Sequence, residues 1–302
     1  MQPPATSLPD NAFFVLGSTA VGKSQLAVQL AERIGGEIVG ADAFQIYEGL
    51  DILSAKPDAA LLRRIPHHLI SKVPLARSYD VAAYRAASLE RIADIAQRGA
   101  VPIICGGNGL YVRALTHGLS SEMPVADAAL RASLEKEPIA ALVERLRALD
   151  PNHTVDEKNL RRVVRALEVC IVTGQPFSAF RQEWDSAPPV RGVILSRPRE
   201  ELLARITRRT EEMFAAGVVA EVAGTKDIGP TASQMLGLRE IQSHIAGDLS
   251  LPACKTAIAI GTRQYAKRQG TWFRRERRFT WMDLSTEPDP LGRLTLMATI
   301  IS

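Results

Sequence analysis

The feature of this sequence that most constrains its fold is a glycine-bounded octapeptide between an apolar run and an amphipathic stretch. Residues 17–24 follow the spacing G-x-x-x-x-G-K-[ST]. The apolar run at residues 12–16 predicts a buried strand, and apolar residues recur at helical spacing from residue 23 to residue 34. A strand, a glycine-bounded loop and a helix in this order arrange loop amides and a helix N-terminus around an anion. The octapeptide therefore predicts a loop that binds a polyphosphate.

The side chains of this phosphate-binding loop add a charge and a metal ligand to its amides. Lys23 brings a full positive charge, and the hydroxyl of Ser24 is suited to hold Mg²⁺ that bridges phosphate oxygens. The motif predicts the kind of ligand and leaves the reaction open. All eight loop residues are candidates for diphosphate binding: Gly17, Ser18, Thr19, Ala20, Val21, Gly22, Lys23 and Ser24.

Strands and helices alternate along most of the chain. Further strands are predicted at residues 37–41, 101–105 and 190–195. Further helices are predicted at residues 81–98, 200–216 and 251–269. Such alternation is typical of a mostly parallel sheet flanked by helices, and we expect an α/β core of the P-loop NTPase-like kind.

The middle of the chain has a different pattern. Residues 124–172 show helical spacing and no convincing strand, with Pro138, Pro151 and Gly174 as breaks. We therefore expect a helical insertion at residues 119–187. The core would then be discontinuous, formed by residues 8–118 and 188–302.

Composition excludes several classes of protein. The three cysteines, Cys105, Cys170 and Cys254, lie far apart and form no CxxC pair, so neither a disulfide framework nor a zinc site is expected. The first residues contain no basic and apolar signal peptide, and no apolar run approaches the roughly 20 residues of a membrane span. We expect a soluble cytoplasmic protein, with a monomer as the default state.

A carboxylate follows the second predicted strand. Asp42 lies where the ends of parallel strands converge on bound phosphates, so it is placed to accept a proton from a nucleophile. A turn or N-cap aspartate fits the same position, and the residues alone do not separate the two roles. Asp51, nine residues later, is the weaker candidate, and a structural role is expected for it.

Basic residues gather near the end of the chain, interleaved with aromatic ones. Basic side chains neutralise a nucleic-acid backbone and aromatic rings stack on bases, but a solvated helix face with inward aromatics fits the same pattern. Two further arginine groups, at residues 161–165 and 205–209, allow phosphate contact or mere solubility, and the pair His67 and His68 is expected to be structural. The residues of the basic stretch are Arg263, Tyr265, Lys267, Arg268, Trp272, Phe273, Arg274, Arg275, Arg277, Arg278 and Phe279.

Taken together, five segments resemble the tRNA dimethylallyltransferase family, the tRNA isopentenyl transferases of bacteria. The resemblance runs from about residue 13 to residue 281, and a string of motifs in this order is far more specific than the phosphate-binding loop alone. The segments are residues 17–24; 41–51 (ADAFQIYEGLD) with 55–57 (AKP); 106–111 (GGNGLY); 165–169 (RALEV) with 173–174 (TG); and 262–269 (TRQYAKRQ) with 272–274 (WFR).

This resemblance implies an activity and roles for individual residues. Enzymes of the family transfer a dimethylallyl group from its diphosphate to N6 of the adenosine just 3′ of the anticodon, and a helical insertion helps to hold the anticodon stem-loop. The resemblance implies catalytic roles for Asp42 as general base, for Asn108, and for Arg209 beside the diphosphate. It implies tRNA contacts for Asp42, Ala43, Phe44, Gln45, Asn108, Arg131, Arg161, Arg162, Val163, Val164, Arg165, Gln234, Gly237, Arg239, Arg263, Lys267 and Arg268.

The sequence departs from the family pattern at four positions. Asn108 stands where a threonine is usual, Ala43 where a serine is, Asn159 where an aspartate is common and Leu238 where a tyrosine is. We expect activity to survive, because the base and the phosphate-binding loop remain.

Two other functions fit parts of the sequence. In a P-loop small-molecule kinase that binds ATP, Asp42 would deprotonate a hydroxyl that attacks the γ-phosphate. Such a kinase would have little use for the basic stretch. A non-catalytic RNA-binding protein would not need Lys23, Ser24 and Asp42 intact.

Overall fold

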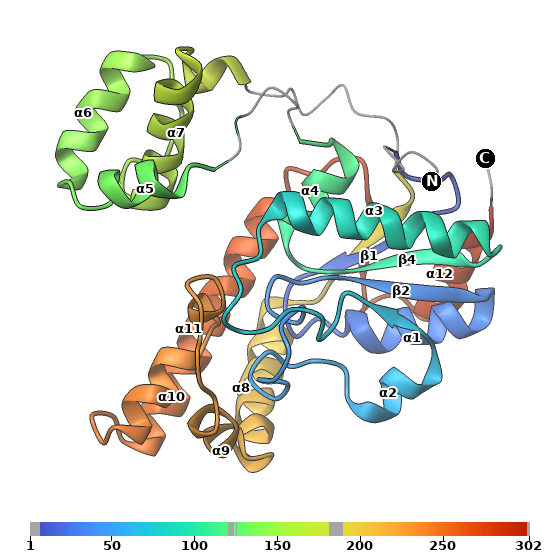
Figure 1. Ribbon diagram of the computed structural model, residues 1–302. Coiled ribbons are helices and arrows are strands. Elements are labelled where there is room, and N and C mark those ends of the chain that lie inside the picture. Colours follow the sequence, from blue (N-terminus) through green and yellow to red (C-terminus); the bar gives the residue numbers. More distant parts are fainter. Residues whose placement is uncertain (1–6, 120–123, 125, 181–189, 301–302) are drawn as a thin grey trace. The chain divides into compact units, whose positions relative to one another are not determined.

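The computed structural model describes residues 7–119, 124, 126–180 and 190–300. Within these residues six strands form one sheet in the order β3-β2-β4-β1-β5-β6, and every described strand pairing is parallel (Figure 1). The parallel α/β sheet expected from the sequence is confirmed. The strands are β1 (Phe13–Gly17), β2 (Gly36–Ala41), β3 (His67–His68), β4 (Val101–Gly106), β5 (Gly192–Ser196) and β6 (Thr280–Asp283).

The register brings the ends of three strands level with one another. Gly106, at the end of β4, pairs with Leu16 of β1 on one side and with Ala41 of β2 on the other. The segments that follow these strands therefore leave the sheet at the same edge, which is where ligands bind in open parallel sheets. These segments are the phosphate-binding loop, the turn that begins with Asp42, and the loop that begins with Gly107.

Helices cover both faces of the sheet, and the side chains of β1 alternate between them. Phe13 and Val15 belong to one buried cluster, whereas Phe14 and Leu16 belong to the other. A strand buried on both faces reads as a continuous apolar run, and this explains the pattern of residues 12–16. The first face is covered by α1 (Lys23–Ile34), α2 (Ala59–Arg64) and α12 (Pro290–Thr299), and the second by α3 (Val81–Gln97) and α4 (Gly109–Thr116) (Figure 1).

A group of helices beside the sheet has a buried cluster of its own. Cys254 and Ile258 pack there against Leu50 and Leu53, which belong to the segment after Asp42. The carboxylate of Glu221 also accepts hydrogen bonds from the backbone N–H groups of residues 52 and 53, at 2.8 and 2.9 Å. The helices are α8 (Arg199–Ala215), α9 (Val218–Ala223), the 3₁₀ turn η2 (Ala232–Gln234), α10 (Leu238–Ile245) and α11 (Leu251–Phe273).

Residues 117–187 form a separate compact unit, and residues 1–116 with 188–302 form the other. The described part of the smaller unit is helical. Its core is made chiefly by Leu142 and Leu146 of α6 and by Leu167 of α7. Its elements are α5 (Ala128–Leu134), α6 (Ile139–Leu149), α7 (Leu160–Thr173) and the 3₁₀ turn η1 (Phe177–Phe180).

The elements expected from the sequence agree closely with the structure, and several short ones were not predicted. The four predicted strands lie within two residues of β1, β2, β4 and β5. The elements that were missed include β3, β6 and α12. Helix α11 continues to Phe273, so the basic residues from Arg274 onward lie beyond it. Of the described helices, none is both long enough and apolar enough to cross a bilayer.

Candidate active site

The phosphate-binding loop leads directly from β1 into α1. Ala20 and Gly22 have left-handed backbone conformations, with φ of 64° and 110°. Such a conformation turns neighbouring N–H groups toward a common point, and this suits an anion. Gly22 is also the N-cap of α1, where no side chain caps the helix, so the first N–H groups of α1 remain available.

Four cationic side chains contact the loop through neutral acceptors. Lys23, Arg205 and Arg209 take part in none of the ion pairs found in the described residues, whereas Arg197 also pairs with Glu201. The positive charge of the first three is thus not cancelled by a bonded carboxylate. The contacts are Lys23 Nζ to Ser18 O (3.3 Å), Arg197 Nε to Val21 O (2.8 Å), Arg205 Nε to Ala20 O (2.7 Å) and Arg209 Nη1 to Thr19 Oγ1 (3.1 Å).

The electrostatics of the loop favour an anionic ligand. Burial lowers the pKa of Lys23 below its ordinary value, and burial likewise lowers the pKa of Arg209. The cause is that each cation has lost hydration without gaining a bonded carboxylate. A bound diphosphate would supply the missing negative charge to both.

Asp42 begins a tight turn at the end of β2. Its Oδ1 accepts hydrogen bonds from Phe44 N at 2.9 Å and from Gln45 N at 3.4 Å. The turn role weighed from the sequence is therefore present. It does not exclude the role of base, because one carboxylate oxygen caps the turn and the second oxygen is left for another partner.

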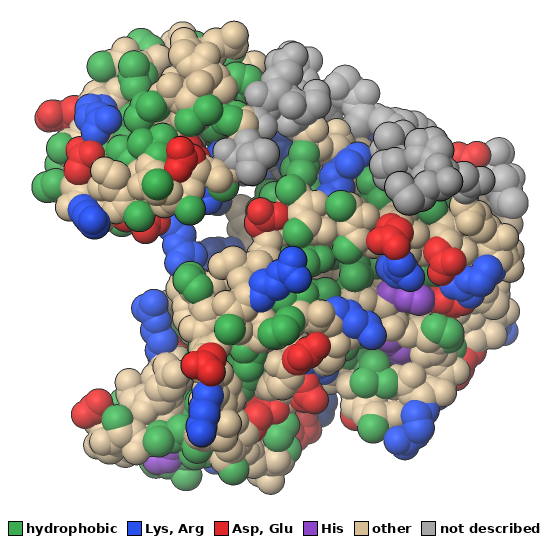
Figure 2. All heavy atoms as spheres, viewed as in Figure 1, with side chains coloured by type: hydrophobic (Ala, Val, Ile, Leu, Met, Phe, Trp, Pro, Cys, Tyr) green, Lys and Arg blue, Asp and Glu red, His purple; other side chains and the backbone are tan. Residues whose placement is uncertain are grey.

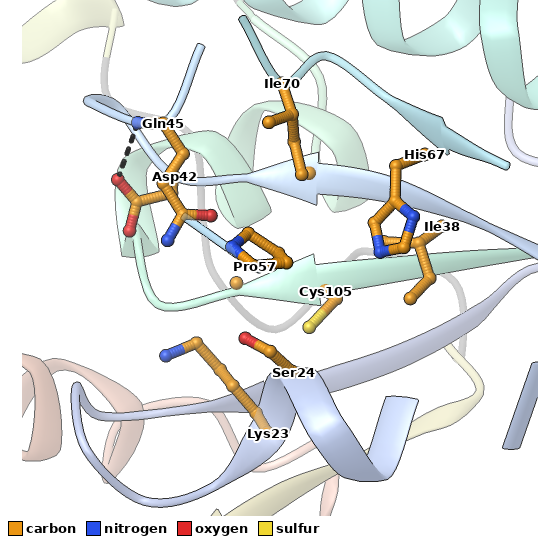
Figure 3. Close-up of a pocket in the computed structure, with 11 residues that line it drawn as sticks. Lys23, Ser24, Ile38, Asp42, Gln45, Pro57, His67, Ile70 and Cys105 are labelled. Atoms are coloured by element: carbon orange, nitrogen blue, oxygen red, sulfur yellow. Dashed lines mark hydrogen bonds between the residues drawn. The ribbon is translucent and has the colours of Figure 1, made fainter. Parts of the chain in front are cut away.

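Asp42 and Lys23 line one pocket, which they reach from the end of β2 and from the start of α1 (Figure 3). Ser24 lines it as well. Lys23, Asp42 and Gln45 lie at one end of the pocket and Ile38 and His67 at the other, with Ser24 and Cys105 between them (Figure 3). Burial raises the pKa of the Cys105 thiol to about 11, so the thiol stays protonated at neutral pH. The whole lining is Lys23, Ser24, Ile38, Gly40, Asp42, Gln45, Pro57, His67, Ile70, Cys105 and Gly106.

Asn108 lies at the start of α4 and holds the loop that follows β4. Its Oδ1 accepts hydrogen bonds from Leu110 N at 3.1 Å and Tyr111 N at 3.3 Å, and its own N–H donates to Ala41 O at 3.2 Å. The side-chain oxygen thus caps the N-terminus of α4. No described residue accepts a hydrogen bond from the Nδ2 group, which remains the part of Asn108 that could meet a substrate.

Gln269 belongs to this site and was not among the residues singled out from the sequence. Its Oε1 accepts from Thr19 N at 2.8 Å, and its Nε2 donates to Gly107 O at 2.9 Å. It shares the buried face of α11 with Ala266 and Phe273, at helical spacing. An amide on an otherwise apolar helix face must have partners, and this signal could have revealed it.

The site can now be compared with known proteins. A family model described as IPP transferase matches residues 45–276. A tRNA dimethylallyltransferase of Akkermansia muciniphila is 39% identical over 279 residues, which are 92% of this chain and 95% of that protein. The chain belongs to the tRNA dimethylallyltransferase family. The resemblance seen in the sequence motifs is confirmed.

Other members and solved structures agree with this membership. The tRNA dimethylallyltransferase of Geobacter metallireducens is 43% identical over 282 residues, covering 89% of this chain and 91% of that protein. The crystal structure of a tRNA isopentenylpyrophosphate transferase from Bacillus halodurans is 31% identical, with a TM-score of 0.69 over 96% of this chain and 95% of the other. A eukaryotic dimethylallyltransferase, crystallised in a study of its action on tRNA, has a TM-score of 0.79 at 24% identity and shares the fold.

In this family member the tRNA contacts expected next to Asp42 lie in the turn after β2. Ala43 packs against the buried cluster around Phe14, and Phe44 packs against the cluster around Leu50. Gln45 Nε2 donates to Ala55 O at 2.9 Å, which ties the turn to the loop before Pro57. The weaker acid, Asp51, forms an ion pair with Lys56, as a structural residue would.

The expected tRNA contacts on α11 are exposed. Arg263 Nη2 donates to Thr207 Oγ1 at 3.0 Å, Lys267 is exposed, and Arg268 lies over the ring of Tyr265 at 5.7 Å. Lysine and arginine side chains project from the edge of the core that α11 forms (Figure 2). Their partners here are neutral, so their charge remains available to an anionic backbone.

The expected contacts near α10 are of mixed character. Gln234 lies exposed in η2, and Arg239 is exposed on α10. Gly237 is buried as the N-cap of α10, with φ of 89°, so any contact through it would involve its backbone.

The candidates in the smaller unit fall into three groups. Arg161 and Arg162 are exposed at the start of α7. Arg131 and Arg165 instead bind the wholly buried carboxylate of Glu168, and Arg131 does so with two nitrogens, at 2.9 and 2.8 Å.

Val163 and Val164 form the third group. They are 0% and 2% exposed and belong to the core of the smaller unit. Any tRNA contact through them would involve their backbone, because α7 turns these two side chains toward α6.

Proposed function

We propose that this chain transfers a dimethylallyl group from dimethylallyl diphosphate to N6 of the adenosine just 3′ of the anticodon in tRNA. The observation that carries the proposal is the shared pocket of Lys23, from the phosphate-binding loop, and Asp42, from the end of β2. A leaving diphosphate and an accepted proton need these two groups on either side of one reacting carbon.

The leaving group is stabilised by the phosphate-binding loop. As the bond between the allylic carbon and oxygen breaks, negative charge gathers on the diphosphate. Loop amides, Lys23 and Arg209 stabilise this charge, since their existing partners are neutral.

Asp42 assists the nucleophile. The exocyclic amine is weakly nucleophilic, and it forms the new carbon–nitrogen bond as it loses a proton to the free carboxylate oxygen of Asp42. The amides of Phe44 and Gln45 hold the other oxygen, which fixes the orientation of the carboxylate. Base assistance of this kind contributes about 10²- to 10⁴-fold.

The chain suits Mg²⁺ as a cofactor. Ser24 supplies a hydroxyl to the pocket, and the described residues contain no cluster of three His, Cys, Asp or Glu side chains that would form an all-protein metal site. Mg²⁺ is commonly held by one or two protein ligands together with substrate phosphates and water, and Ser24 meets that need. The ion would neutralise charge on the leaving diphosphate.

The second substrate is the anticodon stem-loop of tRNA. Exposed arginine and lysine side chains on α11 bind its backbone, as do Arg161 and Arg162 of the smaller unit. The target adenosine must leave the base stack to reach Asp42. Family membership favours this activity over the small-molecule kinase.

The proposal is tested by incubating the purified chain with Mg²⁺, dimethylallyl diphosphate and unmodified tRNA. Mass analysis of the digested nucleosides should show adenosine heavier by one prenyl group. Turnover of ATP with a small acceptor, and no prenylated nucleoside, would support the kinase instead.

Replacing Asp42 by Asn tests the base directly. Asn keeps an oxygen that can accept from Phe44 N, so the turn should persist, yet it cannot take up the proton. We expect the rate constant at saturating substrates to fall by about 10²- to 10⁴-fold, with unchanged thermal stability and tRNA affinity. Asp51→Asn, a change of the same kind at an exposed ion pair, is the matched control. Loss of tRNA binding in Asp42→Asn would contradict the assignment.

A further inference from the structure

Gln269 is a buried side chain whose polar atoms both serve other parts of the chain. It is 6% exposed, and two of its hydrogen bonds reach Thr19, 250 positions away, and Gly107, 162 positions away. Both of these partners are backbone groups, and the Tyr265 hydroxyl, on the same helix, is a further side-chain partner of Gln269. The carboxamide therefore constrains the backbone of two loops.

The two loops lie on opposite sides of the chemistry. Thr19 belongs to the phosphate-binding loop, and its hydroxyl accepts from Arg209. Gly107 precedes Asn108, whose N–H donates to the carbonyl of Ala41, the residue before Asp42. One side chain thus joins the loop that holds the leaving group to the segment that carries the base.

The fit at this bridge is close. A Cβ atom added at Gly107 would lie 2.5 Å from Gln269 Nε2 and 2.8 Å from the carbonyl oxygen of Gly17. Only glycine allows the loop after β4 to approach the phosphate-binding loop so nearly. The separation of the two loops is accordingly set by the Gln269 carboxamide together with the close approach of Gly107 to Gly17.

We propose that Gln269 is a positioning residue for prenyl transfer, which fixes the distance between the diphosphate and Asp42. The inference rests on the proposed function, since it assigns the two sides of the pocket to leaving group and base. Gln269 acts from α11, the helix that carries the exposed Arg263, Lys267 and Arg268. A displacement of about 1 Å between reacting groups costs on the order of 10²-fold in rate.

The first test is Gln269→Met in the full chain, because Met has a similar shape and can replace neither hydrogen bond. The single-turnover rate constant at saturating tRNA and dimethylallyl diphosphate should fall by about 10²-fold. The dissociation constant for tRNA should stay within about threefold of the original, since the exposed cations that bind RNA are untouched. Gln29→Met is the matched control. Gln29 lies half-buried in the second turn of α1, away from these loops, and its replacement should leave the rate unchanged.

The second test is Gln269→Glu, measured from pH 8 to pH 5. An ionised Glu can accept from Thr19 N but repels the Gly107 carbonyl, whereas a protonated Glu can accept from one and donate to the other. The ratio of the rate constant of the original chain to that of Gln269→Glu should therefore fall toward one as the pH falls. This arm also decides the matter if Gln269→Met fails to fold.

Three results would overturn the inference. One is a lower melting temperature for Gln269→Met with an unchanged rate per folded molecule, which would indicate a role in stability alone. Another is a raised KM for the diphosphate with unchanged kcat, which would indicate ground-state binding. The third is a pH-independent deficit in Gln269→Glu. Failure of the proposed function would look different, because the original chain itself would then yield no prenylated adenosine.

Discussion

The arginines of α8 that contact the phosphate-binding loop and the arginines of the smaller unit are the same residue type in opposite electrostatic situations. At the loop, Arg205 and Arg209 donate to a carbonyl and a hydroxyl, which are neutral. In the smaller unit, Arg131 and Arg165 surround the carboxylate of Glu168, which is 0% exposed. The charge of the bonded partner therefore distinguishes the two groups. The first group has a positive charge that no bonded carboxylate neutralises, and the second group forms ion pairs inside the folded unit.

The pKa directions agree with this distinction. Burial lowers the pKa of Arg209, as expected for a desolvated cation with no bonded carboxylate. Burial alone would raise the pKa of Glu168, but hydrogen bonds from Arg131, Arg165 and the backbone of Asp127 outweigh it, so the pKa of this carboxyl lies below its ordinary value. The arginines beside the phosphate-binding loop thus keep an unneutralised positive charge, whereas the charges of Arg131 and Arg165 are neutralised by Glu168.

Among the changes that test this contrast, Arg209→Gln should have the largest effect. Gln can still donate to Thr19 Oγ1 but brings no charge to the diphosphate, so the rate constant should fall by about 10²- to 10³-fold. The free energy of unfolding should not fall, because a buried cation without a bonded carboxylate is removed. Single-turnover kinetics and urea unfolding measure the two quantities.

Arg208→Gln is the matched control for this change. Arg208 is the preceding residue on α8, is 66% exposed and pairs with Glu212. Its replacement should leave the transfer rate unchanged. If Arg209→Gln destabilised the chain as strongly as it slowed transfer, the contrast between the two regions would be lost.

Glu168→Gln should act on stability in the smaller unit. Arg131 and Arg165 would lose their buried partner, which we expect to cost about 3 kcal/mol of the free energy of unfolding at pH 7. Because the folded-state pKa of Glu168 is depressed, its contribution is present above the unfolded pKa of about 4.3 and is lost as the pH falls through the folded value. The difference in the free energy of unfolding between the original chain and Glu168→Gln should therefore narrow below about pH 4.

Urea unfolding of the full chain at pH 7 and at lower pH, followed by a probe in residues 117–187, gives this comparison. Glu157→Gln is the control, since Glu157 forms an exposed pair with Arg147 and should matter little. An equal loss of unfolding free energy in Glu168→Gln and Glu157→Gln would show that burial of the carboxylate does not determine its contribution to stability.

The smallest effect should come from Arg161→Gln and Arg162→Gln. Both side chains are exposed, so stability should be unchanged and tRNA affinity should fall a few-fold. The slope of log affinity against log salt should decrease by about 0.7–0.9 for each charge removed. Filter binding across salt concentrations measures it, with Arg147→Gln, an exposed arginine already paired with Glu157, as control. An unchanged slope would show that these two arginines do not contact the tRNA backbone.

Long periodic patterns and dense motifs could be read from the sequence, and contacts between distant residues could not. The run at residues 12–16 and the phosphate-binding loop gave β1 and the start of α1, because their signals are local. β6 was hidden, since it is an edge strand of four residues with one fully buried side chain, Met282. Gln269 was missed for another reason, as its two partners lie in loops far along the chain.

Arginine roles were the hardest to predict. Residues 161–165 read as one basic stretch, yet α7 divides them into two exposed arginines, two buried valines and one arginine bound to Glu168. The stretch alone carries no information on where a buried carboxylate will lie. Burial at helical spacing explains Val163 and Val164 after the fact, and the same spacing could have raised the question beforehand.

The position of β4 between β1 and β2 sets the spacing between the phosphate-binding loop, which follows β1, and Asp42, which follows β2. Strands in a sheet are about 4.8 Å apart, so two such steps separate the ends of β1 and β2 by roughly 9–10 Å. The loop that follows β4 therefore lies between the phosphate-binding loop and the turn of Asp42, and in the proposed reaction the two substrates have to meet beside it.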